Sequence, residues 1–189
     1  MRAPDPRNQQ QKDIKTMRIA YTIAPGRGDV DRVLKCFADH LAHRGLRTCG
    51  VVQINTERDY ASKCDMDVQV LPAGPIIRIS EYRGRGARGC RLDPVALEQA
   101  VMEVSRRMEA EVDVLIVNKF GKHEAEGRGF RNIIAEALLR DIPVIVGASA
   151  LNLEAFNSFF AGLATPIAPS VAALVRWFET SHCDCVGMA

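Results

Sequence analysis

Short apolar runs alternate with segments of helical periodicity along most of the chain. The strand-like runs are Met17–Ile23, Thr48–Ile54, Val112–Val117 and Pro143–Gly147. Between them, apolar side chains recur every three or four residues, which is the spacing of an amphipathic helix. Strands that alternate with helices form parallel sheets covered on both faces. The pattern therefore predicts an α/β fold, a three-layer sandwich with a mainly parallel sheet.

The expected helices have recognisable start and stop signals. Asp93 and Pro94 occupy the cap and first helical positions of a helix that continues to Met108. Asp29 or Asp31 can cap an earlier helix that stops near Gly45. Three further helices are expected at Arg131–Arg140, Leu151–Phe160 and Ser170–Thr180, with a short strand at Ala164–Ile167.

Residues 55–80 interrupt the alternation. Asp65–Leu71 alternates polar and apolar side chains, Pro72–Pro75 has the composition of a turn, and Ile76–Ile79 is apolar again. This arrangement predicts an antiparallel β-hairpin inserted into the α/β frame, with one face in contact with water.

Length and composition favour one folded domain. The first sixteen residues contain Pro4, Pro6 and a glutamine run, so we expect residues 1–16 to be a disordered leader. The rest of the 189 residues suits a single α/β domain at 17–180 with a flexible tail at 181–189. No apolar run is long enough to cross a bilayer and no secretory signal is recognisable, so we expect a cytoplasmic protein without a membrane partner.

The loop after the first strand, Ala24–Asp29, stands where nucleotide-binding proteins carry a phosphate-binding P-loop. In the pattern G-x-x-x-x-G-K-[ST], the lysine position holds Asp29 and the Ser/Thr position holds Val30. A tight turn is one interpretation of this loop. Phosphate binding is the other, with these candidates: Gly26, Arg27 and Gly28.

The net charge of +2 conceals a basic cluster at Arg78–Arg91, a segment that contains five arginines and one glutamate. Glycines in this segment let the backbone approach a ligand, and the forked guanidinium of arginine suits multi-oxygen anions. A solvated basic loop is the alternative. The candidate ligand-binding residues are Arg83, Arg85, Arg88 and Arg91.

A third loop, Asn118–Arg131, follows the most apolar strand and should lie where open α/β sheets bind ligands, beyond the carboxyl ends of the strands. A salt-bridged loop is the alternative to a functional site. The candidate ligand-binding residues are Asn118, Lys119, Lys122, Arg128 and Arg131. The candidate acid/base or metal-ligating residues are His123, Glu124 and Glu126.

Four of the six cysteines fall into two groups. Cys64 lies in the predicted hairpin and Cys90 in the basic segment, and with Met66 they could form a soft metal site. Two buried small side chains are the alternative. Cys36 and Cys49 fall on an apolar helix and an apolar strand, and we expect both in the core.

Three motifs carry a family resemblance: Cys64-x-Met66, Gly89–Asp93 (GCRLD) and Val117–Gly129 (VNKFGKHEAEGRG). Over about residues 17–178 the chain resembles the bacterial Domain of Unknown Function 2478 family, whose members are often associated with molybdenum or other metal-handling genes. The layout is also similar to the P-loop cancer-related nucleoside-triphosphatases, which implies a P-loop NTPase-like fold. In that comparison Asn118 and Lys119 replace the acidic Walker B residues, so the resemblance does not imply hydrolysis.

These observations predict a small anionic ligand, a nucleotide or phosphate-like oxyanion, bound between the three loops by a protein of accessory or regulatory role. The alternative is a divergent nucleoside-triphosphatase, or another phosphate-ester hydrolase or transferase, that uses His123 or Glu124. Nucleic-acid binding through the Arg/Gly segment ranks last, because only Tyr82 is available there for base stacking. A nucleotide, Mg²⁺ or a soft metal remains open as the cofactor, and a homodimer remains open as an assembly.

Overall fold

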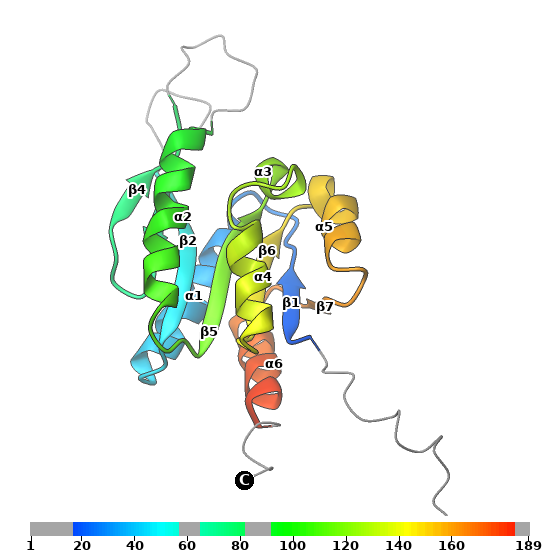
Figure 1. Ribbon diagram of the computed structural model, residues 1–189. Coiled ribbons are helices and arrows are strands. Elements are labelled where there is room, and N and C mark those ends of the chain that lie inside the picture. The colour runs from blue at the N-terminus through cyan, green and yellow to red at the C-terminus, as the bar shows by residue number, and fades with distance from the viewer. Residues whose placement is uncertain (1–16, 57–64, 82–91, 184–189) are drawn as a thin grey trace, which may run out of the picture.

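A sheet with helices on both faces forms the frame of the protein (Figure 1). The computed structural model describes residues 17–56, 65–81 and 92–183. The strands are β1 (Ile19–Thr22), β2 (Thr48–Thr56), β3 (Asp65–Val70), β4 (Ile76–Arg78), β5 (Val114–Phe120), β6 (Val144–Ala148) and β7 (Thr165–Ile167). The helices are α1 (Asp29–His43), α2 (Pro94–Met108), α3 (Lys122–Ala125), α4 (Arg131–Leu139), α5 (Leu153–Phe159) and α6 (Val171–Cys183), with a 3₁₀ turn η2 at Ala150–Asn152.

The described strands lie in the order β4-β3-β2-β5-β6-β1-β7. Strands β2, β5, β6, β1 and β7 pair in parallel, whereas β3 and β4 pair antiparallel at one edge. The predicted α/β class, the mainly parallel sheet and the inserted hairpin are therefore confirmed. The leader predicted at residues 1–16 lies outside the described residues, and α6 continues past Thr180 into the segment expected as a tail.

The core has one apolar layer on each face of the sheet. Helices α2, α4 and α5 cover one face, and α1 and α6 cover the other; in Figure 1, α2 and α4 lie in front of the sheet and α1 behind it. Strand β5 serves both layers, because Leu115 and Val117 contact the first while Val114 and Ile116 contact the second. This double burial explains why the segment is a nearly unbroken apolar run.

The two long helices begin differently. The Asp93 carboxylate caps α2, accepting hydrogen bonds from the backbone N–H groups of Val95 (2.9 Å) and Ala96 (3.1 Å), as predicted. The cap predicted for α1 is wrong. Gly28, not an aspartate, precedes the helix with φ of 79°, which glycine adopts readily. Asp29 and Asp31 instead lie in the first turn.

One of the two expected core cysteines is buried. Cys49 lies in the core, and burial raises the pKa of its thiol to about 11. Cys36 is exposed on α1, so the expectation was wrong for that residue. Among the described residues, no helix is long and apolar enough to cross a membrane.

Candidate functional site

The topology fixes where a ligand crevice can open. Strand β1 leads into α1 on one face of the sheet, and its neighbour β6 leads into α5 on the other face. At such a switch point the two loops separate, and ligands of open α/β sheets bind beyond the carboxyl ends of the strands. This end of the sheet is the upper edge in Figure 1, where α3 and α5 also lie.

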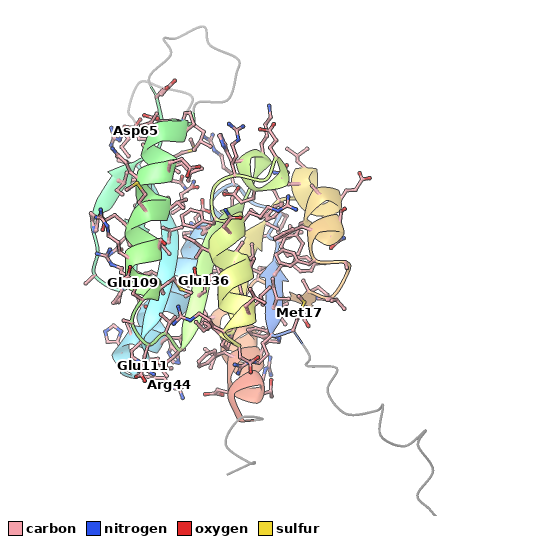
Figure 2. The ribbon with its side chains drawn as sticks, viewed as in Figure 1. Met17, Arg44, Asp65, Glu109, Glu111 and Glu136 are labelled. Atoms are coloured by element: carbon pink, nitrogen blue, oxygen red, sulfur yellow. The ribbon has the colours of Figure 1, made fainter. Side chains whose placement is uncertain are left out.

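Ion pairs occupy the opposite end of the sheet, where strands β2 and β5 begin. Arg44 pairs with Glu179 at 2.7 Å, and Arg47 pairs with Asp113 at 2.6 Å and also with Glu111. Figure 2 shows Arg44 and Glu111 together at this lower end, far from Asp65 at the upper end. These pairs lie at the end of the sheet opposite the carboxyl ends of the parallel strands, which is where open α/β sheets bind ligands.

Three residues form a row across the switch point. Thr22 on β1 and Asn118 on β5 both pair in register with Gly147 on β6, so their side chains share the face that α1 covers. A Cβ on Gly147 would lie 2.8 Å from Val30 and 2.9 Å from Leu34, so α1 packs closely against this row. Thr22 is 0% exposed and Asn118 2% exposed. Within the described part of the chain, the Thr22 hydroxyl and the Asn118 amide atoms have no hydrogen-bond partner.

The loop before α1 brings glycine backbone and acidic side chains together. A Cβ on Gly26 would lie 1.9 Å from Asp29 Oδ2, so the Asp29 carboxylate packs against this glycine. Asp29 also pairs with Arg32 one turn along the helix. Arg27 is exposed, and Gly28 contributes no side-chain cap to the first turn of α1. The three residues predicted to bind phosphate are thus at the carboxyl edge, with a carboxylate beside them.

Asp31 connects this loop to the ends of two strands. Its side chain is 4% exposed, and Oδ2 accepts hydrogen bonds from Asn55 Nδ2 (2.5 Å) and Gln53 Nε2 (3.4 Å) at the end of β2. Lys119 Nζ, from the end of β5, lies 3.4 Å from Oδ1. The Lys119 side chain is 37% exposed. The first turn of α1 and the end of β5, which are far apart in the sequence, therefore meet at one ion pair.

Glu124 holds the third loop closed. The residue is 3% exposed; Oε2 accepts a hydrogen bond from Gly121 N–H (2.9 Å) and Oε1 accepts one from Phe130 N–H (3.2 Å). Gly129, with φ of 61°, passes so close that a Cβ there would lie 2.2 Å from Oε1. Burial raises the pKa of the Glu124 carboxyl. These contacts favour a structural role, and the predicted catalytic role of Glu124 and half-buried His123 stays a prediction.

The remaining charges of the third loop form surface pairs. Lys122 and Arg128 both pair with Glu126, whose pKa is lowered mainly by the hydrogen bond from Arg128. The Arg131 guanidinium lies 4.0 Å from the centre of the Phe159 ring. Exposed ion pairs contribute little to stability, so Lys122 and Arg128 can turn toward a ligand at small cost. Arg131 is held more firmly, because its guanidinium makes a cation–π contact with the Phe159 ring.

The basic segment and the soft-metal prediction fall mostly outside the described residues. This applies to Arg83, Arg85, Arg88, Arg91, Cys64 and Cys90. Met66 is half-buried on β3 and packs against the core. Arg78 pairs with Asp65 (2.8 Å) and Asp67 (2.9 Å), which ties the hairpin together.

The described residues do not themselves form a metal centre. No group of three His, Cys, Asp or Glu side chains in ranges 17–56, 65–81 and 92–183 is arranged to hold an ion. Val30, at the position of the P-loop Ser/Thr, is 7% exposed and packs in the core. Its hydrocarbon side chain has no oxygen that could bind a magnesium ion in the way the P-loop hydroxyl does.

Comparison with known proteins places the chain in a family. Residues 19–177 match the family model described as Protein of unknown function (DUF2478). The chain belongs to this family. It is also 32% identical over 167 residues to the Molybdenum import ATP-binding protein ModC 2 of Bradyrhizobium diazoefficiens. That alignment covers 88% of this chain but only 19% of the relative. No solved structure shows significant similarity.

Several residues of the site in this DUF2478 protein were not anticipated from the sequence. Thr22 is a polar residue in an apolar strand, and Gln53 and Asn55 are polar residues at the end of β2. Gly147 ends an apolar run, where a glycine permits close packing. For Asp31 the sequence indicates only a possible helix cap, because spacing along the chain gives no sign of its contact with Lys119.

Proposed function

We propose that this chain binds an anionic ligand, a nucleotide or a phosphate-like oxyanion, at the carboxyl ends of β1, β5 and β6. Its role would be accessory or regulatory, in molybdenum or other metal-cofactor metabolism. The observation that carries the proposal is the contact between Lys119 and Asp31. It brings a lysine ammonium from the third loop to the first turn of α1, directly beside the glycine-containing loop.

The physical chemistry of this place favours an anion. The first N–H groups of a helix lack intrahelical acceptors, and the helix dipole gives that end a partial positive charge. Helix α1 has fifteen residues and no side-chain cap from Gly28. Lys119 brings an ammonium group to the same end, where it is paired with Asp31, and Lys122 and Arg128 lie on the neighbouring loop. Beneath the first turn of α1 lie two more buried polar groups, the Thr22 hydroxyl and the Asn118 amide, which have no hydrogen-bond partner among the described residues.

Binding without hydrolysis is the form of the proposal that fits these residues. Asp29 and Val30 replace the lysine and the hydroxyl residue of the P-loop pattern, so we interpret the loop as a degenerate Walker A motif. The name of the relative, a molybdenum import ATP-binding protein, suggests two ligands to test, ATP and an oxyanion of molybdenum. Because the chain spans only 19% of that protein, any share in its transport activity belongs to the proposal.

Isothermal titration calorimetry with ATP, GTP, phosphate, molybdate and tungstate tests the proposal. We expect at least one of these anions to bind, and Lys119→Met to weaken its binding about tenfold to hundredfold, because a charge-assisted hydrogen bond contributes about 1.5–3 kcal/mol. Lys35→Met is the matched control. Lys35 also pairs with an aspartate, Asp39 at 2.6 Å, and Asp39 lies about two turns after Asp31 in α1. The proposal fails if no anion binds, or if the two variants bind equally well.

A further inference from the structure

We infer that Asp31 is a built-in counter-ion, which competes with the ligand for Lys119 and thereby restrains anion binding. This inference rests on the proposed function and concerns the regulation of the same site. In the structure the Lys119 ammonium is neutralised by a carboxylate of the protein itself, 3.4 Å away. A ligand must draw the lysine away from that carboxylate before it gains the full charge.

The two partners differ in their freedom to move. The Asp31 carboxylate is 4% exposed, and the side chains of Asn55 and Gln53 both donate hydrogen bonds to its Oδ2 atom. Lys119 is 37% exposed and contacts Asp31 without the geometry of a hydrogen bond. The lysine, with its flexible four-carbon stem, is therefore the partner that moves.

Moving Lys119 has an energetic consequence for Asp31. Its Oδ1 atom is buried and has no hydrogen-bond donor among the described residues, so Lys119 supplies the cation that Oδ1 contacts. Removing one partner of a buried ion pair leaves an uncompensated buried charge, which is strongly unfavourable. This penalty opposes ligand binding. It also implies that a polyanion, which attracts Lys119 more strongly, overcomes the restraint more easily than a singly charged ion does.

Removing the negative charge of Asp31, next to the site, should strengthen anion binding. Asp31→Asn keeps the shape of the side chain and an oxygen that can accept the Asn55 hydrogen bond, but it no longer attracts Lys119. We expect this variant to bind ATP and inorganic phosphate at least fivefold more tightly than the wild-type chain, as measured by calorimetry. Asp31→Ser is the second variant, since its hydroxyl is small and neutral and leaves Lys119 equally free.

Asp39→Asn is the matched control, because it removes the same charge from the same helix and releases Lys35 instead of Lys119. We expect less than a twofold change for this variant. A double variant, Asp31→Asn with Lys119→Met, should lose the gain. The inference is overturned if folded Asp31→Asn or Asp31→Ser protein binds no more tightly than the wild type, or if Asp39→Asn gives the same gain. That result leaves the proposed function standing when wild-type binding and its loss in Lys119→Met are observed, whereas absence of binding in all forms removes both.

Discussion

Replacing Glu124 with glutamine separates a structural role of this residue from a catalytic one. In the structure both carboxylate oxygens accept backbone hydrogen bonds, from Gly121 N–H at 2.9 Å and from Phe130 N–H at 3.2 Å. Glutamine has the same shape but only one acceptor oxygen. Its NH₂ group must face one of the two N–H donors, which then has no acceptor.

The size of the effect follows from that lost acceptor. A buried donor left without a partner costs about 1–3 kcal/mol. For a domain of this size, each kcal/mol lowers the unfolding midpoint by about 2–4 °C, so we expect Glu124→Gln to unfold roughly 2–10 °C below the wild-type chain. The glutamine side chain has little room to move away from the donor that it cannot pair with, because Gly129 already packs directly against the position of Oε1.

Differential scanning calorimetry at pH 7 measures this midpoint. Glu126→Gln is the control, because Glu126 is in the same loop but exposed, and its partners are the surface cations Lys122 and Arg128. We expect its midpoint to match that of the wild type. An unchanged midpoint in Glu124→Gln, together with loss of a nucleotide-hydrolysing activity found in the wild type, would refute the structural interpretation and favour a catalytic one.

Two further predictions concern stability. Burial raises the pKa of the Glu124 carboxyl, so the folded state holds this proton more tightly than the unfolded state does. The protonated carboxyl therefore stabilises the fold. This contribution is complete below the ordinary pKa of 4.5 and is lost as the pH rises through the raised pKa. The stability advantage of the wild type over Glu124→Gln should therefore shrink with rising pH in urea titrations; an advantage that grows would contradict this sign. Gly50→Ala should destabilise the chain by about 3 kcal/mol or more, because φ is 108° and the new Cβ would lie 1.9 Å from the carbonyl oxygen of Ile116 on β5. Gly45→Ala, with φ of 77° and no atom within 4 Å of its Cβ, should cost only about 1 kcal/mol, and equal losses in the two variants would show that the close approach to Ile116 is unimportant.

The frame of the fold was predictable because local patterns specify it. The apolar run at Val112–Val117 and the Asp93-Pro94 helix start each depend on neighbouring residues, and both appear in the structure. The same helical spacing also held the information that Cys36 is exposed. Leu34, Phe37 and Leu41 define the buried stripe of α1, and position 36 lies off that stripe.

The site itself was predictable only as a set of loops. Sequence placed the candidates after β1 and β5, which is correct for the topology, but it could not pair Asp31 with Lys119 across the sheet. Nor could it separate the two acidic residues of the third loop. Glu124 is buried beneath the backbone and Glu126 is exposed, although they are only two positions apart. Such distinctions depend on how the loop folds back on itself, and residue type and spacing do not encode them.

Anion binding where the first turn of α1 meets the end of β5 is the proposal on which the binding predictions depend. Titration of uniformly ¹⁵N-labelled protein with ATP and with molybdate, followed by two-dimensional amide NMR, tests it most directly. We predict that the largest shift changes cluster at residues 26–31 and 118–122, with little change at residues 44–47 and 111–113 at the opposite end of the sheet. Changes concentrated at that opposite end, or no saturable change with either anion, would contradict anion binding at the first turn of α1.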